Sequence, residues 1–164
     1  MNDLPKALGI DHIVDRIYIS GWRATHYDGY LRQAGITHIL KLYEGIPSFP
    51  ADFDVCENPV EDGELIPADQ LRRGVDFVIE QLEAGRPVLV MCGAGISRSA
   101  TFVLAALVQR GYDLHDAFVL LRAKHNEATP HPNLWLSLIA CYDLPYKLAD
   151  VMEWMHRDDN AAQP

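Results

Sequence analysis

The sequence predicts a single-domain α/β fold, in which a central, mostly parallel sheet of about four or five strands is flanked by helices. Apolar segments with strand character alternate along the chain with segments whose apolar residues recur at helical spacing. One apolar run, at 88–91, has no polar alternation, which is typical of a strand covered on both faces. The length of 164 residues, with 49% hydrophobic and 23% charged residues, fits one soluble globular domain over residues 1–164.

The first half of the chain predicts a strand, a helix and a second strand. Residues 16–20 alternate in the strand manner, residues 36–42 are β-branched and apolar, and residues 25–33 between them can be helical. A short strand is expected at 53–58. A polar loop at 61–64 then precedes the long helix of the second half.

The second half predicts a series of helices after the buried strand. Proline at position 67 and glycine at position 85 bracket the clearest helical pattern, glycine at position 111 ends the next helix, and Asp113 can cap the one after that. The expected helices lie at 67–83, 99–110, 113–124, 132–142 and 146–157. The core is expected to span about residues 11–144, with the helix at 146–157 packed onto it and a polar tail after it.

The net charge and the hydropathy of the chain argue against some classes of binding partner. The net charge of −9 opposes non-specific binding to nucleic acid or to an anionic membrane surface. No apolar run approaches the roughly 20 residues of a membrane span, and the first residues lack a charged-then-apolar signal segment. We therefore expect a cytoplasmic protein without a nucleic-acid or membrane partner.

The cysteines and histidines do not predict a metal site or a disulfide framework. The chain has 3 cysteines, widely separated at Cys56, Cys92 and Cys141, and 7 scattered histidines. His125 and His131 flank a loop that can approach the candidate site, but surface or packing roles are the expectation for both. We expect reduced thiols, no metal and no cofactor.

The segment 92–98 carries the clearest chemical signal. A buried strand that breaks into a glycine-bearing loop and then a helix directs backbone N–H groups at one point, and the helix start adds partial positive charge. Cys92 occupies the first position of this loop and Arg98 the last. The Arg98 guanidinium can donate two parallel hydrogen bonds to a phosphate, and the same field favours the thiolate of Cys92.

Each of these residues also has a simpler explanation. A lone cysteine after an apolar run is usually a small buried hydrophobic residue, and an arginine at a helix start is usually on the surface. A structural cysteine, however, does not require Gly95, Arg98 and Ser99 at these spacings. The combination favours a phosphate-binding loop.

Residues 92–99 resemble the signature of the protein tyrosine phosphatase superfamily, and residues 94–99 resemble its dual-specificity branch. Weaker similarity at 16–21, 35–42 and 131–133 extends the resemblance over about residues 11–144. The resemblance implies a protein tyrosine phosphatase-like fold for the whole chain.

The resemblance also implies roles for individual residues. Cys92 is the nucleophile that forms a phosphocysteine, Arg98 binds the phosphate, and Ser99 helps the thiolate leave. The phosphate is held by the loop residues Gly93, Ala94, Gly95, Ile96 and Ser97 together with Arg98. Asp62 is the general acid and base, although Glu61, Glu64 and Asp69 lie close in sequence and a polar run before a helix is commonly just solvated.

The expected substrates are phosphorylated proteins. Gly93, Ala94, Ile96 and Ser97 are uncharged, whereas relatives that favour inositol phospholipids tend to carry lysines inside this loop. The chain has no long insertion to deepen the cleft, so the resemblance implies hydrolysis of phosphotyrosine together with phosphoserine and phosphothreonine.

One departure from the family keeps other functions open. Met91 stands where the family usually has a histidine that orders the loop and stabilises the thiolate. This departure motivates the alternative of a catalytically impaired pseudophosphatase that binds phosphoproteins. A second alternative is another cysteine enzyme, such as a sulfur transferase or an arsenate reductase, although Ser99 and Asp62 fit phosphatase chemistry better.

Overall fold

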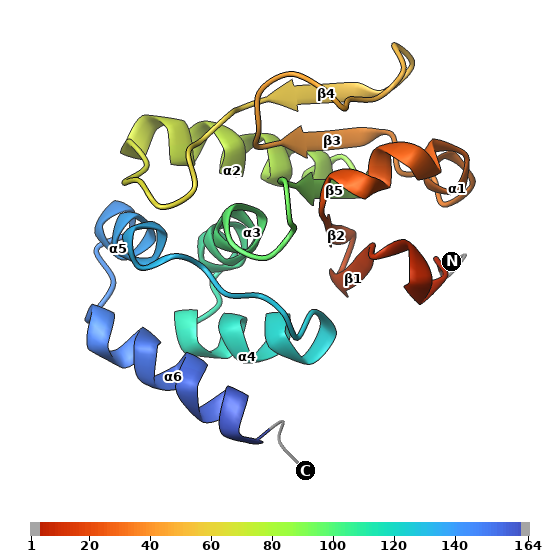
Figure 1. Cartoon of the computed structure of the whole chain (residues 1–164). Helices are drawn as coiled ribbons and strands as arrows, with labels where there is room; N and C mark the ends of the chain where they lie inside the picture. The colour runs from red at the N-terminus through yellow and green to blue at the C-terminus, as the bar shows by residue number, and fades with distance from the viewer. Residues whose placement is uncertain (1–3, 162–164) are drawn as a thin grey trace.

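The computed structural model describes residues 4–161, so residues 1–3 and 162–164 of the expected domain lie outside the described part. At its centre is a five-stranded sheet with the strand order β1-β2-β5-β3-β4 (Figure 1). The strands are β1 (Asp11–Val14), β2 (Ile17–Ser20), β3 (His38–Lys41), β4 (Asp54–Glu57) and β5 (Val88–Met91). Only β1 and β2 pair antiparallel, which confirms the mostly parallel sheet.

The central position of β5 explains its continuous apolar sequence. Val88, Leu89, Val90 and Met91 are all buried, and β5 pairs in parallel with β2 on one side and β3 on the other. Its side chains divide between two apolar clusters on opposite faces of the sheet. Both faces are thus covered, as the absence of polar alternation predicts.

Helices cover the two faces unequally (Figure 1). One face packs against η2 (Trp22–Tyr27) and α1 (Asp28–Gln33), and the other carries the larger core under the remaining α-helices. These are α2 (Ala68–Glu83), α3 (Arg98–Gln109), α4 (Leu114–Lys124), α5 (Pro132–Cys141) and α6 (Leu148–Ala161), while a short 3-10 turn, η1 (Lys6–Leu8), precedes β1. The Asp113 carboxylate accepts from Asp116 N–H, which confirms the predicted cap of α4.

In the first half of the chain, two elements differ from the predictions. The helix expected at 25–33 begins as a 3-10 helix and becomes α-helical only at Asp28. β1 was not predicted, because it is a four-residue edge strand with a partly exposed polar start, so it shows no apolar alternation.

The last helix is longer than predicted and belongs to the main core. α6 continues to Ala161, four residues beyond the expected end at 157. Val151 is fully buried, and the Trp135 indole N–H lies 3.4 Å from Met155 Sδ. Trp154 completes an aromatic group with Phe118 and Trp135, so α6 closes the side of the core formed by α4 and α5.

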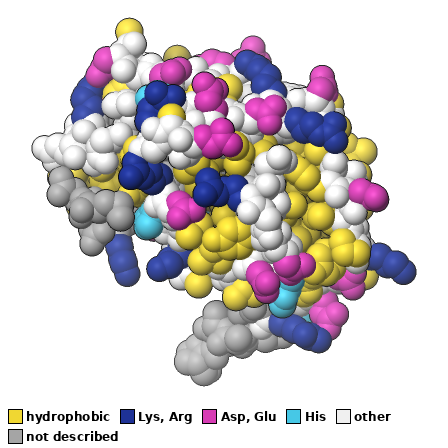
Figure 2. Space-filling model, turned by 180° about the vertical axis from the view of Figure 1, so that it is seen from behind, with side chains coloured by type: hydrophobic (Ala, Val, Ile, Leu, Met, Phe, Trp, Pro, Cys, Tyr) yellow, Lys and Arg dark blue, Asp and Glu magenta, His cyan; other side chains and the backbone are white. Residues whose placement is uncertain are grey.

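Charges of both signs are mixed over the surface. Figure 2 shows acidic and basic side chains interspersed with apolar ones on the face opposite to that of Figure 1. Within residues 4–161, no helix is both long and apolar enough to cross a bilayer.

A close helix crossing under the site depends on Gly74. A Cβ atom at this position of α2 would lie 2.7 Å from Phe102 Cδ1 and 2.9 Å from Asn58 Nδ2. Phe102 and Asn58 are both fully buried, so neither side chain can retreat into solvent. The missing side chain lets α2 pack directly against α3, the helix that begins at Arg98.

We expect Gly74→Ala to lower the free energy of unfolding by about 1–3 kcal/mol, because overpacking outweighs the gain in helix propensity. Gly29→Ala in α1 is the matched control. Nothing lies within 4 Å of its added Cβ, so this change should be neutral or raise stability by up to about 1 kcal/mol. Urea unfolding curves measure both values, and equal effects at the two positions would contradict the packing argument.

Candidate active site

The loop 92–98 crosses the loop after β2 at a point where only glycine fits. Gly95 has φ +77°, and a Cβ at this residue would lie 2.5 Å from Gly21 N. A Cβ at Gly21 would lie 2.8 Å from Gly93 O. The two loops therefore contact each other through backbone atoms. This contact requires glycine both at position 95 and at position 21, directly after β2.

The carbonyl groups of the loop are anchored by the surrounding protein. Each anchoring donor comes from outside the loop. The bonds are Trp22 N–H to Gly93 O at 2.9 Å, His125 Nε2 to Gly95 O at 2.6 Å, Thr129 N–H to Ile96 O at 2.6 Å, and Thr101 N–H to Ser97 O at 3.0 Å.

These anchors determine where the amides point. In a planar trans peptide, the C=O of one residue and the N–H of the next point in opposite directions. Tethering Gly93, Gly95 and Ile96 by their oxygens therefore turns the N–H groups of Ala94, Ile96 and Ser97 the other way. Among residues 4–161, no group bonds these three amides. They are donors available to an anion.

Cys92 lies at the base of this arrangement. Its side chain is 2% exposed, the Gly95 N–H donates to its Sγ at 3.3 Å, and Ser99 Oγ lies 3.2 Å from the same sulfur. Ser99 is itself fully buried in the first turn of α3. The sulfur thus has two hydrogen-bonding neighbours, the Gly95 amide and the Ser99 hydroxyl.

Arg98 reaches back toward the start of the loop. Its Nη1 donates to Val60 O at 3.1 Å and to Leu42 O at 3.4 Å, which hold the guanidinium between the segments after β3 and β4. Its Nη2 lies 3.0 Å from where a Cβ of Gly93 would stand. The absence of a side chain at Gly93 leaves space for the guanidinium at this end of the loop.

Asp62 contacts the loop directly. The Ser97 hydroxyl donates to Asp62 Oδ1 at 2.7 Å, and Ser97 Oγ in turn accepts from His131 N–H at 3.0 Å. Asn133 Nδ2 donates to Gly63 O at 2.8 Å from the start of α5. The segment with Asp62 is therefore fastened at two points and brings an exposed carboxylate to the loop 92–98.

Met91 packs beside the buried hydroxyl group of Ser20. It pairs with Ser20 across β2 and β5 and is fully buried in the cluster against η2 and α1. Ser20 Oγ is buried without a hydrogen-bond partner among the described residues. The thioether is only a weak acceptor and does not bond this hydroxyl, whereas a histidine, which the family usually has at position 91, offers a ring nitrogen.

A buried lysine supports the loop that follows β3. Lys41 is fully buried, its Nζ lies 3.1 Å from Glu57 Oε2 and 4.6 Å from the centre of the Tyr43 ring, and it also donates to Gly45 O. Burial, with smaller contributions from the charges of Glu57 and Cys92, raises the pKa of Tyr43 to about 12. Tyr43 thus remains a neutral phenol near the site, donating to Pro47 O.

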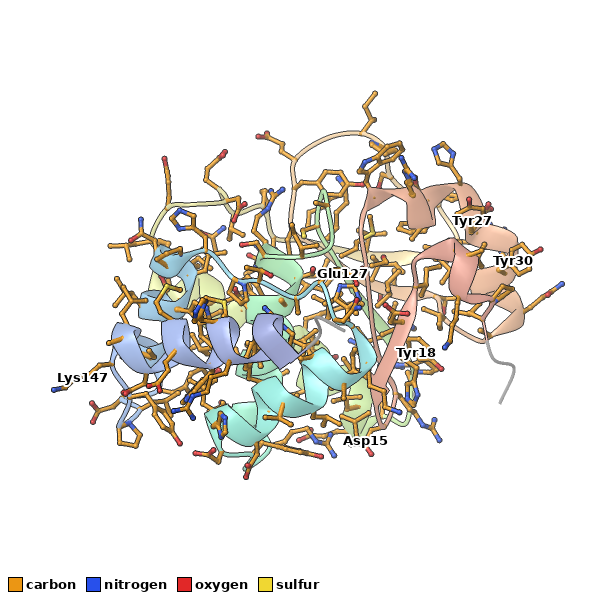
Figure 3. The ribbon with its side chains drawn as sticks, turned by 60° about the horizontal axis from the view of Figure 1, so that its bottom comes forward. Asp15, Tyr18, Tyr27, Tyr30, Glu127 and Lys147 are labelled. Carbon is orange, nitrogen blue, oxygen red and sulfur yellow. The ribbon has the colours of Figure 1, made fainter. Side chains whose placement is uncertain are left out.

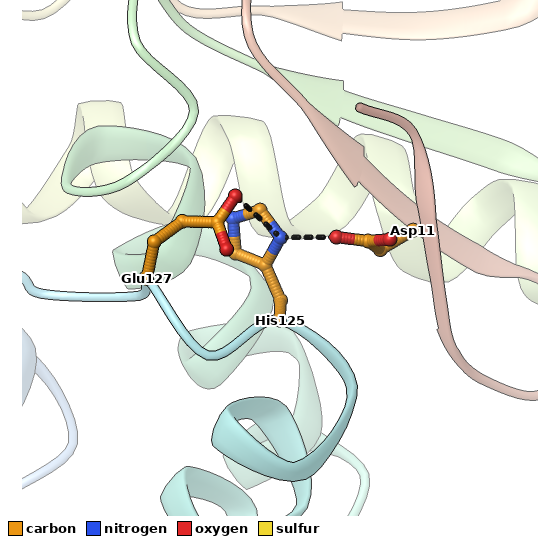
Figure 4. A group of neighbouring side chains, drawn as sticks. All are labelled: Asp11, His125 and Glu127. Atoms are coloured by element: carbon orange, nitrogen blue, oxygen red, sulfur yellow. Dashed lines mark hydrogen bonds and ion pairs between the residues drawn. The ribbon is translucent and has the colours of Figure 1, made fainter. Parts of the chain in front are cut away.

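The sequence did not predict His125 as part of the site. Nδ1 of His125 lies 2.6 Å from Asp11 Oδ2 and 3.6 Å from Glu127 Oε1, and ligand-type atoms of the three residues lie within 4.8 Å of one another (Figure 4). Two ligands of one tetrahedral zinc ion lie about 3.3 Å apart, given zinc–ligand bonds of about 2.0–2.1 Å. The 2.6 Å separation is that of a direct hydrogen bond.

A cavity of about 390 Å³ lies beside the loop and contains polar groups of both signs. Arg23 and Glu127 contribute to its wall, as do Gly93 and Ala94 of the loop. Tyr27 and Glu127, which Figure 3 labels, come from η2 and from the loop after α4. The loop 92–98 therefore borders a cavity.

A family model described as "Dual specificity phosphatase, catalytic domain" matches residues 17–143. Human dual specificity protein phosphatase 9 is 30% identical over 77% of this chain and 34% of its own length. Dual specificity protein phosphatase 1B of Arabidopsis thaliana is 28% identical over 75% of both chains. The chain thus spans about a third of the human relative and three quarters of the plant one.

Solved structures share the fold. Human DUSP28 superposes with a TM-score of 0.75 at 24% identity, covering 82% of this chain and 93% of that chain. A human tyrosine phosphatase-like serine/threonine/tyrosine-interacting protein gives a TM-score of 0.72 at 23% identity, with 82% and 95% covered.

We expect Ser97→Ala to loosen the segment that carries Asp62, because it removes the acceptor for His131 N–H and the donor to Asp62 together. Amide hydrogen exchange at residues 61–66 should accelerate by about tenfold, the equivalent of one charged hydrogen bond. Thr37→Ala, at the opposite end of β3, is the control and should leave this exchange unchanged. Identical exchange in Ser97→Ala and in the wild type would contradict the coupling.

Proposed function

The chain belongs to the dual-specificity phosphatase family, and we propose that it hydrolyses phosphate monoesters of proteins through a phosphocysteine on Cys92. One observation carries the proposal. The sulfur of Cys92 belongs to the same loop as several amides that have no partner among the described residues, and the anchored carbonyl groups of this loop point away from those amides. Such a loop fits the three peripheral oxygens of a phosphoryl group.

In the first step, a lone pair of the Cys92 thiolate forms the S–P bond as the P–O bond to the substrate oxygen breaks. The peripheral oxygens are bound by the Ala94, Ile96 and Ser97 amides and by Arg98. Asp62, protonated at this stage, gives its proton to the departing alkoxide or phenoxide. The product is a neutral alcohol or phenol and a phosphocysteine.

In the second step, water attacks phosphorus and the S–P bond breaks. Asp62, now a carboxylate, accepts a proton from the water, and inorganic phosphate leaves. The electron pair returns to Cys92, where the hydroxyl of Ser99 at 3.2 Å stabilises the thiolate. The charge changes are handled by protein groups, so the proposed reaction requires no metal and activity should survive a chelator.

The site favours protein substrates over charged lipid headgroups. The loop side chains that reach solvent, those of Ala94 and Ile96, are apolar, and Trp22 beside them is 39% exposed. Phosphotyrosine, phosphoserine and phosphothreonine residues are the proposed substrates, and the cytoplasm is the proposed location. We also propose that residues 1–164 form one catalytic domain.

A pseudophosphatase that binds phosphoproteins is the second candidate. Met91 favours it, because the histidine that orders the loop in the family is missing. The presence of Cys92, Arg98, Ser99 and Asp62 in contact with one loop favours the enzyme. The two candidates differ in turnover, which is directly measurable.

We expect the wild type to hydrolyse p-nitrophenyl phosphate, and Cys92→Ser to reduce kcat by at least about 10⁴-fold, since an alcohol at this position is a poor nucleophile. Vanadate should inhibit the wild type competitively. Phosphopeptide binding without turnover in the wild type would favour the pseudophosphatase. Vanadate resistance combined with sulfur transfer from thiosulfate would favour another cysteine enzyme.

Asp62→Asn should lower kcat by about 10²-fold and remove the limb of the pH–rate profile on which activity falls as the acid loses its proton with rising pH. Asparagine keeps an acceptor for the Ser97 hydroxyl but carries no transferable proton. Glu64→Gln is the control in the same segment. A wild-type profile in Asp62→Asn, or loss of the limb in Glu64→Gln instead, would refute the role of Asp62.

A further inference from the structure

His125 is a buried titratable residue that the proposed reaction does not use. It lies directly after α4, its side chain is 2% exposed, and it contacts Asp11 of β1 (Figure 4). Nε2 is 2.6 Å from Gly95 O, and Nδ1 is 2.6 Å from Asp11 Oδ2. Both ring nitrogens therefore have a close partner.

The partners determine where the protons are. A backbone carbonyl can only accept a hydrogen bond, and so can an ionised carboxylate. Nε2–H must donate to Gly95 O, and Nδ1–H to Asp11. The ring is then an imidazolium, and Glu127 Oε1, 3.6 Å from Nδ1, adds a second negative charge beside it.

The hydrogen bond to Gly95 O determines the orientation of one amide of the phosphate-binding loop. The C=O of Gly95 and the N–H of Ile96 belong to one planar peptide and point in opposite directions. Fixing the carbonyl on His125 aims the Ile96 N–H into the cradle, and a cation on the carbonyl side polarises the peptide so that this N–H becomes a stronger donor.

We propose that His125, held as an imidazolium by Asp11, is a positioning residue that fixes the Gly95–Ile96 peptide and thereby aims the Ile96 amide at the phosphate. The histidine that the family usually places before the nucleophile is replaced by Met91, and its ordering function is supplied here from the loop after α4. This inference rests on the proposed function for its kinetic effect, but not for the protonation of the ring.

Two variants separate the contact with the loop from the contact with β1. His125→Gln can place an amide N–H near the position of Nε2 and so keep the bond to Gly95 O. His125→Asn can place its amide near Nδ1, which keeps the contact with Asp11 and loses Gly95. His115→Gln, on the exposed side of the same helix α4, is the control.

We expect His125→Asn to lower kcat/KM for p-nitrophenyl phosphate by about tenfold and to raise the vanadate inhibition constant similarly, the equivalent of one charged hydrogen bond. His125→Gln should stay within about threefold of the wild type on both measures. His115→Gln should match the wild type.

Equal losses in His125→Asn and His125→Gln would overturn the proposal, since a purely structural role does not distinguish the two amides. Wild-type values in both variants would overturn it as well. If the wild type hydrolyses no phosphate ester, the proposed function fails. The positioning role is then tested by how well phosphate protects Cys92 against alkylation, and the same order of the variants is expected.

The protonation is tested without any variant. Two-dimensional ¹H–¹⁵N spectra of the labelled wild-type protein should show both ring nitrogens of His125 protonated at neutral pH, with slowly exchanging protons. A ring with one unprotonated nitrogen would refute the imidazolium, and an unprotonated Nε2 would refute the bond to Gly95 O as well.

Discussion

The site depends on the rigidity of the peptide bond. The C=O and the N–H of a trans peptide point in opposite directions. A hydrogen bond that holds the C=O toward the surrounding protein therefore directs the N–H of the same peptide into the loop. Here the oxygens of Gly93, Gly95, Ile96 and Ser97 all have donors outside the loop. The cradle is thus shaped by its outer contacts, and its inner surface remains open for an anion.

The proposed anion site is compatible with a net charge of −9. The attraction is local: a few oriented N–H dipoles, the start of α3 and one guanidinium act at short distance, while the other charges are screened by solvent. The rigid base beneath them is β5, which is covered on both faces and packs under α3. The close crossing at Gly74 keeps that helix against α2.

Features encoded in neighbouring residues were predictable from the sequence. The buried strand at 88–91, the loop that follows it and the cap at Asp113 each depend on short-range patterns, and the structure has all three. The place of Asp62 before a helix and the family resemblance predict it as a site residue, and in the structure its carboxylate accepts a hydrogen bond from the Ser97 hydroxyl. Its chemical role remains a prediction.

Features that depend on contacts across the fold were not predictable. His125 stands in a polar stretch, so it was assigned a packing or surface role, and only the fold brings it between Asp11 and Gly95. The burial of Lys41 has the same origin, since a lysine at the end of a strand normally indicates exposure. β1 gave no signal because four residues at an edge carry too little periodicity.

The outer donors of the phosphate loop are spread along the chain from residue 22 to residue 129. During synthesis on the ribosome, Cys92 emerges well before two of them. A nascent chain that ends before His125 and Thr129 carries the whole signature sequence, yet lacks the contacts that shape it. The order of translation therefore places the shaping of the loop around Cys92 after the synthesis of the segment between α4 and α5.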